Sequence, residues 1–429
     1  MVTANLSLLK KQALFLVKIN LTSIECKFYN EIMNTLLKLA DLSENMAVEI
    51  EEERSSASGC LLNQASCSPV SPAPRSSSGA NSNLPITRVA LPNGQSMPIL
   101  KTVLTSACEK NCYYCAFRSG RDFRRHTFRP DEMAQAFMDL YRGGAVKGIF
   151  LSSGVAGGAI HTQDRLLDTA DIMRNKLGFQ GYLHLKIMPG AEHAQVERAM
   201  QLADRVSVNL EAPTTERLAR LAPQKIFMEE LLRPLRWVEE IRKNLPAQKG
   251  WKGRWPSTTT QFVAGGAGES DLELLTTTFY LTRKLRLARV YYSGFRPVAG
   301  TPLENQPAIN PWRQNRLYQA SFLIRDYAFD LEDMPFIGSG ELPLDVDPKL
   351  AWARTHLNEA PIEINQADLH ELMRIPGIGP QGARAIISAR RANKIHSLSV
   401  LKSLGIRTAR AAPYILLDGF QPARQPALF

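Results

Sequence analysis

Long hydrophobic runs and cysteines are both scarce in this chain of 429 residues. The apolar run at 13–17 ends at Lys18, far short of the roughly 20 residues of a membrane-spanning helix. No small-residue cleavage site follows it. Six cysteines are too few for a disulfide scaffold of this length. The sequence therefore predicts no membrane anchor, no secretory leader and a reducing, cytoplasmic location, in which cysteines are thiols or metal ligands.

Glycine and proline are not in excess either, with 27 Gly and 26 Pro, which excludes a collagen-like chain. The chain is 44% hydrophobic and 22% charged, a composition that supports a large core and excludes wholesale disorder. Its length predicts two or three domains. A net charge of +11 permits a polyanionic partner without identifying one.

Strands and helices alternate over much of the chain. Residues 1–84 are expected to form a helical extension and a Ser/Pro-rich linker, 331–360 a connector, and 361–429 a small all-α unit. Candidate strands between the linker and the connector cover 100–105, 148–152, 182–187, 205–210, 258–263 and 289–292. Six strand–helix units are fewer than the eight of a complete barrel. Residues 85–330 are therefore predicted to form an α/β domain, a partial (β/α)6 barrel of the TIM type.

A cluster of three cysteines follows the first predicted strand. Cys108, Cys112 and Cys115 have the spacing C-x3-C-x2-C. Structural zinc sites use four ligands, and no second Cys pair or His pair supplies the fourth. Three thiolates suit a [4Fe–4S] cluster with one iron left open. A zinc site and a chance arrangement are the alternatives.

With Tyr114 before the last cysteine, the cluster resembles the C-x3-C-x-aromatic-C motif of the radical S-adenosylmethionine (SAM) enzymes. The resemblance implies that the three cysteines hold three irons and that SAM chelates the fourth. It also implies a low-potential electron donor as a partner. Reductive cleavage of SAM would then give a 5′-deoxyadenosyl radical that abstracts hydrogen from a substrate.

The same resemblance implies that groups at the carboxyl ends of the strands hold SAM. Ser152-Ser153-Gly154 stands where the family has Gly-Gly-Glu, and it lacks the glutamate. An ordinary strand-to-helix turn is the alternative there. The residues expected to contact the cofactor are Ser153, Gly154, Asn209, Glu211, Val263, Gly265 and Tyr292.

Residues 365–380 resemble a helix-hairpin-helix motif, with Asn365 as the expected N-cap of its first helix. Gly377 and Gly379 are expected to adopt positive φ and to leave backbone N–H groups open to a phosphate. Residues 361–429 hold nine basic and four acidic residues. The residues expected to contact nucleic acid are Gly377, Gly379, Arg384, Arg390 and Lys394.

Together the two motifs resemble radical SAM proteins assigned to DNA modification or repair. The resemblance implies a radical SAM enzyme that acts on nucleic acid, DNA by preference. One alternative is a protein or small-molecule substrate, with the hairpin as a docking module. A second is a non-catalytic iron–sulfur protein that binds nucleic acid. Cys60 and Cys67 in the linker are either exposed thiols without a role or an extra cluster ligand.

Overall fold

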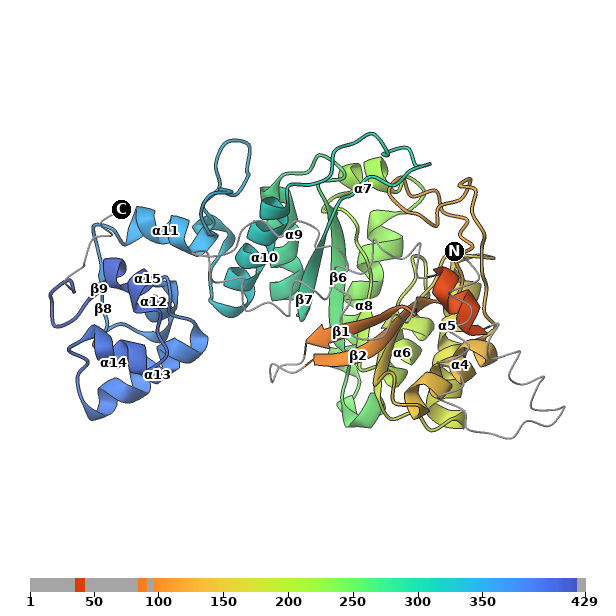
Figure 1. Cartoon of the computed structure of the whole chain (residues 1–429), viewed down its shortest axis with the longest axis horizontal. Coiled ribbons are helices and arrows are strands. Elements are labelled where there is room, and N and C mark those ends of the chain that lie inside the picture. Colours follow the sequence, from red (N-terminus) through yellow and green to blue (C-terminus); the bar gives the residue numbers. More distant parts are fainter. Residues whose placement is uncertain (1–34, 43–83, 91–95, 423–429) are drawn as a thin grey trace, which may run out of the picture. The chain divides into compact units, whose positions relative to one another are not determined.

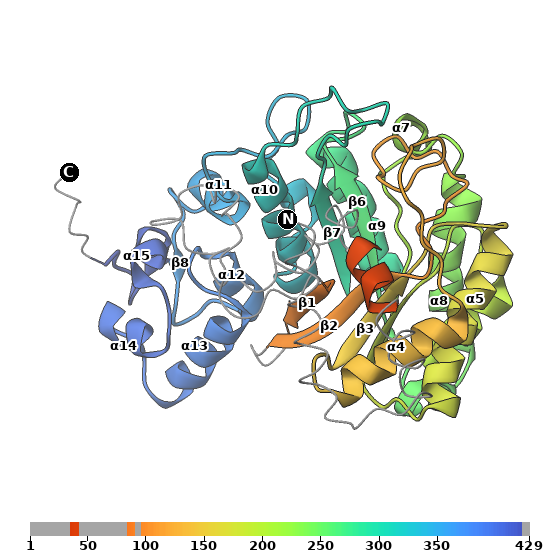
Figure 2. The same cartoon turned by 45° about the vertical axis from the view of Figure 1, so that its right-hand side comes forward.

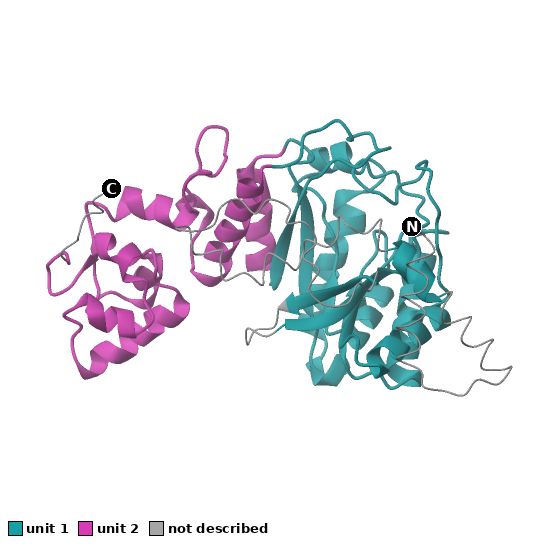
Figure 3. Cartoon of the chain, viewed as in Figure 1, with its two compact units in different colours: residues 1–268, 285–309 teal, residues 269–284, 310–429 magenta. Residues whose placement is uncertain are grey.

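The computed structural model describes residues 35–42, 84–90 and 96–422. Cys60 and Cys67 lie outside these residues, as does most of the predicted extension and linker. None of the helices described is long and apolar enough to cross a membrane. The chain divides into two compact units (Figure 3), one running up to Gly268 with Leu285–Ile309 added, and the other comprising Glu269–Lys284 and the chain from Asn310 onward.

The first unit is built on a seven-stranded sheet whose strands lie in chain order (Figure 1). The first strand pairs antiparallel with the second, and all later neighbours are parallel. The predicted partial barrel of six parallel strands is thus confirmed. The strands are β1 (Ile86–Ala90), β2 (Ser96–Val103), β3 (Gly148–Ser152), β4 (Tyr182–Lys186), β5 (Arg205–Ser207), β6 (Ser257–Ala264) and β7 (Arg289–Gly294).

Helices α4, α5, α6 and α8 pack against one another in that order on the outer side of the sheet (Figure 2). Their apolar stripes explain this position, since α4 buries Met133, Phe137 and Leu140. A short helix over 35–42 lies beside α4, where Lys38 pairs with Glu132 at 2.7 Å. The helices are α4 (Pro130–Arg142), α5 (Ala159–Asp171), α6 (His193–Leu202), α7 (Thr215–Leu221) and α8 (Arg233–Asn244).

Two elements of this unit are absent from the sequence prediction. Strand β1 is one, and helix α7 is the other. Both are short, so neither shows a long periodic pattern. Helix α7 begins at an N-cap, Thr214, whose side chain accepts a hydrogen bond from the backbone N–H of Arg217 at 3.3 Å. The threonine at this N-cap position is the feature of the sequence from which the start of α7 could have been predicted.

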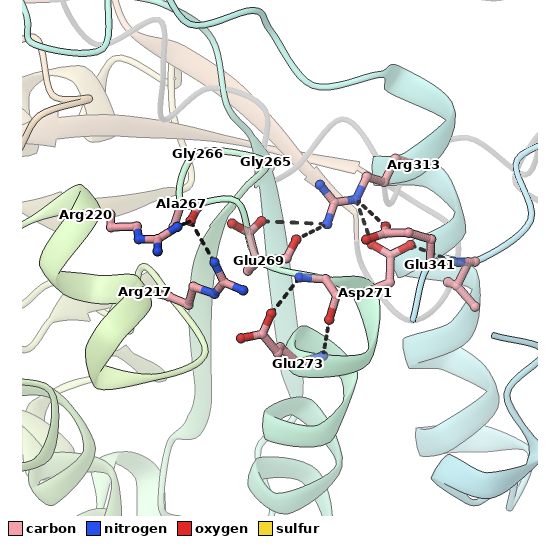
Figure 4. A network of polar contacts seen from close by, with 12 residues as sticks. Arg217, Arg220, Gly265, Gly266, Ala267, Glu269, Asp271, Glu273, Arg313 and Glu341 are labelled. Atoms are coloured by element: carbon pink, nitrogen blue, oxygen red, sulfur yellow. Dashed lines mark hydrogen bonds and ion pairs between the residues drawn. The ribbon is translucent and has the colours of Figure 1, made fainter. Parts of the chain in front are cut away.

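The second unit is mostly helical. Arg313 of α10 pairs with Asp271 at 2.8 Å and with Glu341 at 3.4 Å, and donates to the carbonyl of Glu269 at 2.6 Å (Figure 4). Asp271 also accepts a hydrogen bond from the backbone N–H of Leu342 at 2.9 Å. This network joins the first turn of α9 to α10 and to the chain after it. The helices are α9 (Asp271–Lys284), α10 (Pro311–Asp326), α11 (Pro348–His356), α12 (Leu369–Arg374), α13 (Pro380–Ala392), α14 (Leu398–Ser403) and α15 (Thr408–Ala411).

The predicted cap of the first hairpin helix is wrong. Asp368, not Asn365, is the N-cap of α12, and it forms a capping box with Glu371. The side chain of Asn365 instead bridges to Ile395, donating to its carbonyl at 3.0 Å and accepting from its N–H at 2.9 Å. Both residues are good caps by type, and the capping box with Glu371 marks Asp368 as the true one.

Candidate radical SAM site and nucleic-acid interface

All three motif cysteines line one cavity at the carboxyl ends of the parallel strands. Cys112 is buried, while Cys108 and Cys115 are partly exposed. Ser153 and Asn209 contribute to the same lining. Within the described residues, no three His, Cys, Asp or Glu side chains are arranged to hold a single metal ion. The cavity therefore brings together three thiols and the ends of several strands, where ligands of such sheets bind.

The loop that carries the cysteines is held mainly by Arg125. Its guanidinium donates to the carbonyls of Ser106 at 2.8 Å, Phe117 at 3.0 Å, Arg118 at 2.8 Å and Arg121 at 3.1 Å. These carbonyls lie on both sides of the cysteine motif. The planar guanidinium of Arg125, whose N–H donors have fixed directions, therefore holds the path of the loop.

The loop also packs closely against the turn after β3. The N–H of Gly154 donates to the carbonyl of Thr105 at 2.8 Å. A Cβ at Gly154 would lie 2.3 Å from the carbonyl oxygen of Ala107, a distance that no side chain tolerates. Glu109 donates its N–H to the carbonyl of Val155 at 2.8 Å. Gly154 therefore has a structural reason to be glycine: it lets the cysteine loop approach.

A buried ion pair lies beside the thiols. Lys225 and Glu211 are 2.9 Å apart, and their side chains are 9% and 4% exposed. Burial raises the pKa of the Cys112 thiol, and Lys225 opposes that effect. Burial alone also raises the pKa of Glu211, but Lys225, Lys186 and hydrogen bonds from Lys225 and Tyr114 outweigh it, so the net pKa is lowered.

The pKa of Lys225 shifts in the opposite direction, which likewise favours the charged form of the side chain. Burial alone lowers its pKa, but the neighbouring Cys112 and Glu211 raise it above its usual value. The carboxylate and the ammonium therefore both stay charged. The sequence predicts Glu211 at the site but not Lys225 or Lys186, which also line the cavity. A lysine shows no pattern of its own in a sequence, and Lys225 lies in the loop after α7.

Four of the seven predicted cofactor residues line this cavity: Ser153, Gly154, Asn209 and Glu211. Val263, Gly265 and Tyr292 are not part of its lining. Because Gln261 lines it, the strand alternation and the pairing of Gln261 with Tyr291 put Tyr292 on the opposite face. The Tyr292 ring is fully buried near Phe262 there, so we do not retain it as a cofactor contact.

Gly265 begins the glycine-rich turn after β6 and has a φ of 88°. A Cβ there would lie 3.0 Å from the side chain of Ile309. In the same turn, the carbonyl of Ala267 accepts hydrogen bonds from Arg217 at 3.3 Å and Arg220 at 3.4 Å (Figure 4). Two arginines of α7 thus fix the turn.

In the second unit, the turn between α12 and α13 leaves backbone donors available. Gly377 has a φ of 86°. Gly379 does not share this conformation, and its φ of −104° corrects the prediction. Among the described residues, the N–H groups of Gly377, Gly379, Gln381 and Gly382 have no acceptor. A Cβ at Gly379 would lie 3.2 Å from the hydroxyl of Tyr327, so a side chain there would require a small shift of that ring.

A buried lysine supports this turn from α11. The Lys349 ammonium donates to the carbonyl of Ile378 at 2.5 Å and lies 4.7 Å from the ring centre of Tyr327. Burial lowers the pKa of Lys349 to about 7, although Asp347 acts in the opposite direction. The stretch predicted as a connector therefore builds part of the hairpin.

The three predicted basic contacts differ in their surroundings. Arg384 is exposed on α13. Lys394 is exposed and 4.0 Å from Asp418. Arg390 is half-buried and donates to the carbonyl of Ile364 at 2.7 Å. Arg390 thus has an internal structural role, whereas Arg384 and Lys394 are both exposed.

Comparison with known families agrees with this geometry. A family model described as the radical SAM superfamily matches residues 102–277. The chain contains a radical SAM domain. A model described as the helix-hairpin-helix motif matches residues 357–407. The radical SAM domain makes the protein an enzyme, and the cofactors of that domain are a [4Fe–4S] cluster and SAM.

Solved structures with a related fold include methylornithine synthase, at 15% identity and a TM-score of 0.42 over 53% of this chain and 61% of that chain. The FeFe-hydrogenase maturase HydG from Carboxydothermus hydrogenoformans is 15% identical, with a TM-score of 0.41 over 53% of this chain and 51% of that chain. A radical SAM methyltransferase from Sphaerobacter thermophilus is 17% identical, with a TM-score of 0.40 over 56% of this chain and 75% of that chain. The matches to the first two span about half to three fifths of those proteins. Curated protein sequences give no significant match.

Proposed function

We propose that this radical SAM enzyme modifies or repairs nucleic acid, with DNA as the preferred substrate. Its cluster ligands are Cys108, Cys112 and Cys115. The observation that supports the assignment is that these three thiols share one cavity at the carboxyl ends of the strands. Each thiolate would hold one iron and leave the fourth open. We also propose that the enzyme works in the reducing cytoplasm and receives electrons from a low-potential donor.

When bound, the cluster and SAM supply a 5′-deoxyadenosyl radical. The chain's own residues position and enclose that chemistry. Ser153, Asn209, Val263 and Gly265 are the proposed contacts to SAM. Lys225 places a fixed positive charge next to the thiols, and Glu211 holds that charge in position.

The nucleic-acid part of the proposal depends on the hairpin. Backbone N–H groups at the start of α13 form an anion site, and the helix dipole adds to it. Arg384 is exposed nearby on the same helix. Such contacts give affinity without reading the sequence. We therefore expect tight binding in low salt, little sequence preference and a strong dependence on salt.

The test begins with anaerobic reconstitution of the full chain with iron and sulfide. Changing any one of the three cysteines to Ala should remove the iron–sulfur absorbance and the cleavage of SAM. Cys60→Ala and Cys67→Ala serve as controls that should keep both. Loss of the cluster in Cys60→Ala would contradict the three-ligand assignment.

Adding DNA or RNA to the reconstituted enzyme separates the candidate functions. Stimulation of SAM cleavage by nucleic acid supports the proposal. Cleavage that DNA and RNA leave unchanged favours a protein or small-molecule substrate. A reduced cluster that never cleaves SAM would leave only a non-catalytic binder. Removing the Arg384 side chain should reduce the slope of the logarithm of the binding constant against the logarithm of salt concentration by about one unit. It should also weaken binding to all nucleic-acid sequences by the same factor.

A further inference from the structure

The segment that follows α7 holds the cysteine loop on both sides of Cys112. The N–H of Asn111, the residue before Cys112, donates to the side-chain oxygen of Gln224 at 3.1 Å. The N–H of Tyr113, the residue after it, donates to the carbonyl of Leu221 at 2.7 Å. These two contacts fix the segment after α7 against the central residue of the cysteine motif.

Lys225 directly follows Gln224, so the same contacts bring it to the thiols. Its side chain is 9% exposed and lines the cavity that the three cysteines share. The ammonium lies 2.9 Å from the carboxylate of Glu211, and the backbone N–H donates to the carbonyl of Ala222 at 2.9 Å. Both ends of the residue are therefore held, and the ammonium has a fixed place in the cavity wall.

The other two lysines in the lining of this cavity also have acidic neighbours. Lys110 pairs with Glu230 at 3.4 Å and donates to the carbonyl of Gln224 at 3.2 Å. Lys186 acts on the carboxylate of Glu211, whose pKa it lowers. The position of each charge, and not their sum, therefore decides what the thiols experience.

The pair of Lys225 and Glu211 presents its positive end to the thiols. Burial raises the pKa of the Cys112 thiol, and Lys225 is the largest influence that opposes burial. Glu211 acts in the other direction, but its effect ranks behind that of Lys225. The ammonium therefore dominates over its partner at Cys112, the cysteine that the segment after α7 encloses.

We propose that Lys225 makes the iron–sulfur cluster easier to reduce. In the reduction, the low-potential donor loses one electron and the cluster gains it, so the cluster becomes more negative by one charge. Net charge is among the properties that set the reduction potential of such clusters. A fixed ammonium in a buried site stabilises the more negative state and so raises the potential. The inference rests on the proposed function, because it takes the three motif cysteines as the cluster ligands.

The test measures the midpoint potential of the cluster in the full chain. The chain is reconstituted anaerobically with iron and sulfide, without SAM, and titrated with a reductant while the electron paramagnetic resonance signal of the reduced cluster is recorded. The test variants are Lys225→Met, Lys225→Arg and Glu211→Gln. Lys176→Met is the matched control, because it removes the same charge from an exposed lysine on the outer helical layer.

The two members of the pair should shift the potential in opposite directions. At a fixed donor potential, Lys225→Met should lower the ratio of reduced to oxidised cluster about tenfold, which is a midpoint about 59 mV more negative for a one-electron couple. Glu211→Gln removes the negative end of the pair and should make the midpoint less negative. Lys225→Arg should restore the wild-type value, and the control should keep it. A general loosening of the site would not give shifts of opposite sign.

A midpoint in Lys225→Met equal to that of the control would overturn the inference, as would shifts of the same sign in Lys225→Met and Glu211→Gln. Weaker SAM binding at an unchanged potential would also overturn it, because Lys225 would then act on SAM alone. If Lys225→Met does not fold, Glu211→Gln still decides by the sign of its shift.

Failure of the proposed function looks different. If the wild-type chain gives no cluster signal after reconstitution, the assignment of the three cysteines is wrong and the inference ends with it. If DNA and RNA do not stimulate SAM cleavage while the opposite shifts are still observed, only the nucleic-acid substrate is refuted.

Discussion

Replacing Gly377 by Ala tests whether the hairpin turn needs a glycine for two separate reasons. The first is conformation, because Gly377 has a φ of 86°. The second is space, because a Cβ would lie 2.7 Å from the backbone carbonyl oxygen of Arg407 and 3.2 Å from the Cβ of Arg410. Gly405 provides a matched control: it has a φ of 80° and no heavy atom within 4 Å of a Cβ.

The two substitutions should differ in size. An alanine in the left-handed region costs about 1–2 kcal/mol, and Gly405→Ala should cost only that. Gly377→Ala adds the overlap with a backbone atom that has little room to move, and overpacking of this kind costs about 1–3 kcal/mol. We therefore expect Gly377→Ala to lower the free energy of unfolding by about 2–5 kcal/mol.

Thermal and denaturant unfolding of the full chain measures the difference, followed through the transition of the second unit. Nucleic-acid binding at fixed salt should fall further in Gly377→Ala than in Gly405→Ala, because only the former disturbs the N–H groups at the start of α13. SAM cleavage without nucleic acid should be unchanged in both. Equal losses of stability in the two variants would refute the argument from space.

Three further outcomes follow from single contacts. Lys225→Met leaves the Glu211 carboxylate buried without its ion-pair partner and should lower the free energy of unfolding by about 3–5 kcal/mol. The double variant with Glu211→Gln should regain most of that loss, and no recovery would show that the pair does not matter. Gly154→Ala should reduce the iron bound per chain after reconstitution, since its Cβ would meet the Ala107 carbonyl at 2.3 Å; a full iron content would contradict this. Lys349 binds a proton in the unfolded chain up to its ordinary pKa of 10.5, but in the folded chain only below about 7. Between these values the unfolded chain holds more protons, so stability should rise with pH by up to about 1.4 kcal/mol per unit. Lys349→Met should lose this slope, and parallel profiles of unfolding temperature against pH would disprove it.

Much of the protein is determined by local patterns in its sequence. The alternation of strands and helices follows from hydrophobic periodicity, which reflects only the geometry of the chain itself. The spacing of Cys108, Cys112 and Cys115 is local for the same reason. Gly377 was also found correctly, because a break between two helices with the turn Pro-Gly-Ile-Gly-Pro has few conformations open to it.

Which charged side chains lie next to one another was decided only by the tertiary structure. Lys225 has no motif, and its place beside the thiols depends on how the loop after α7 packs under the cysteine loop. Gly154 reads as a turn residue in the sequence, yet its need for space comes from a loop that lies almost fifty residues earlier. A sequence pattern records distances along the chain, whereas steric and electrostatic energies depend on distances through space. The ion pair and the close approach at Gly154 are therefore properties of the fold.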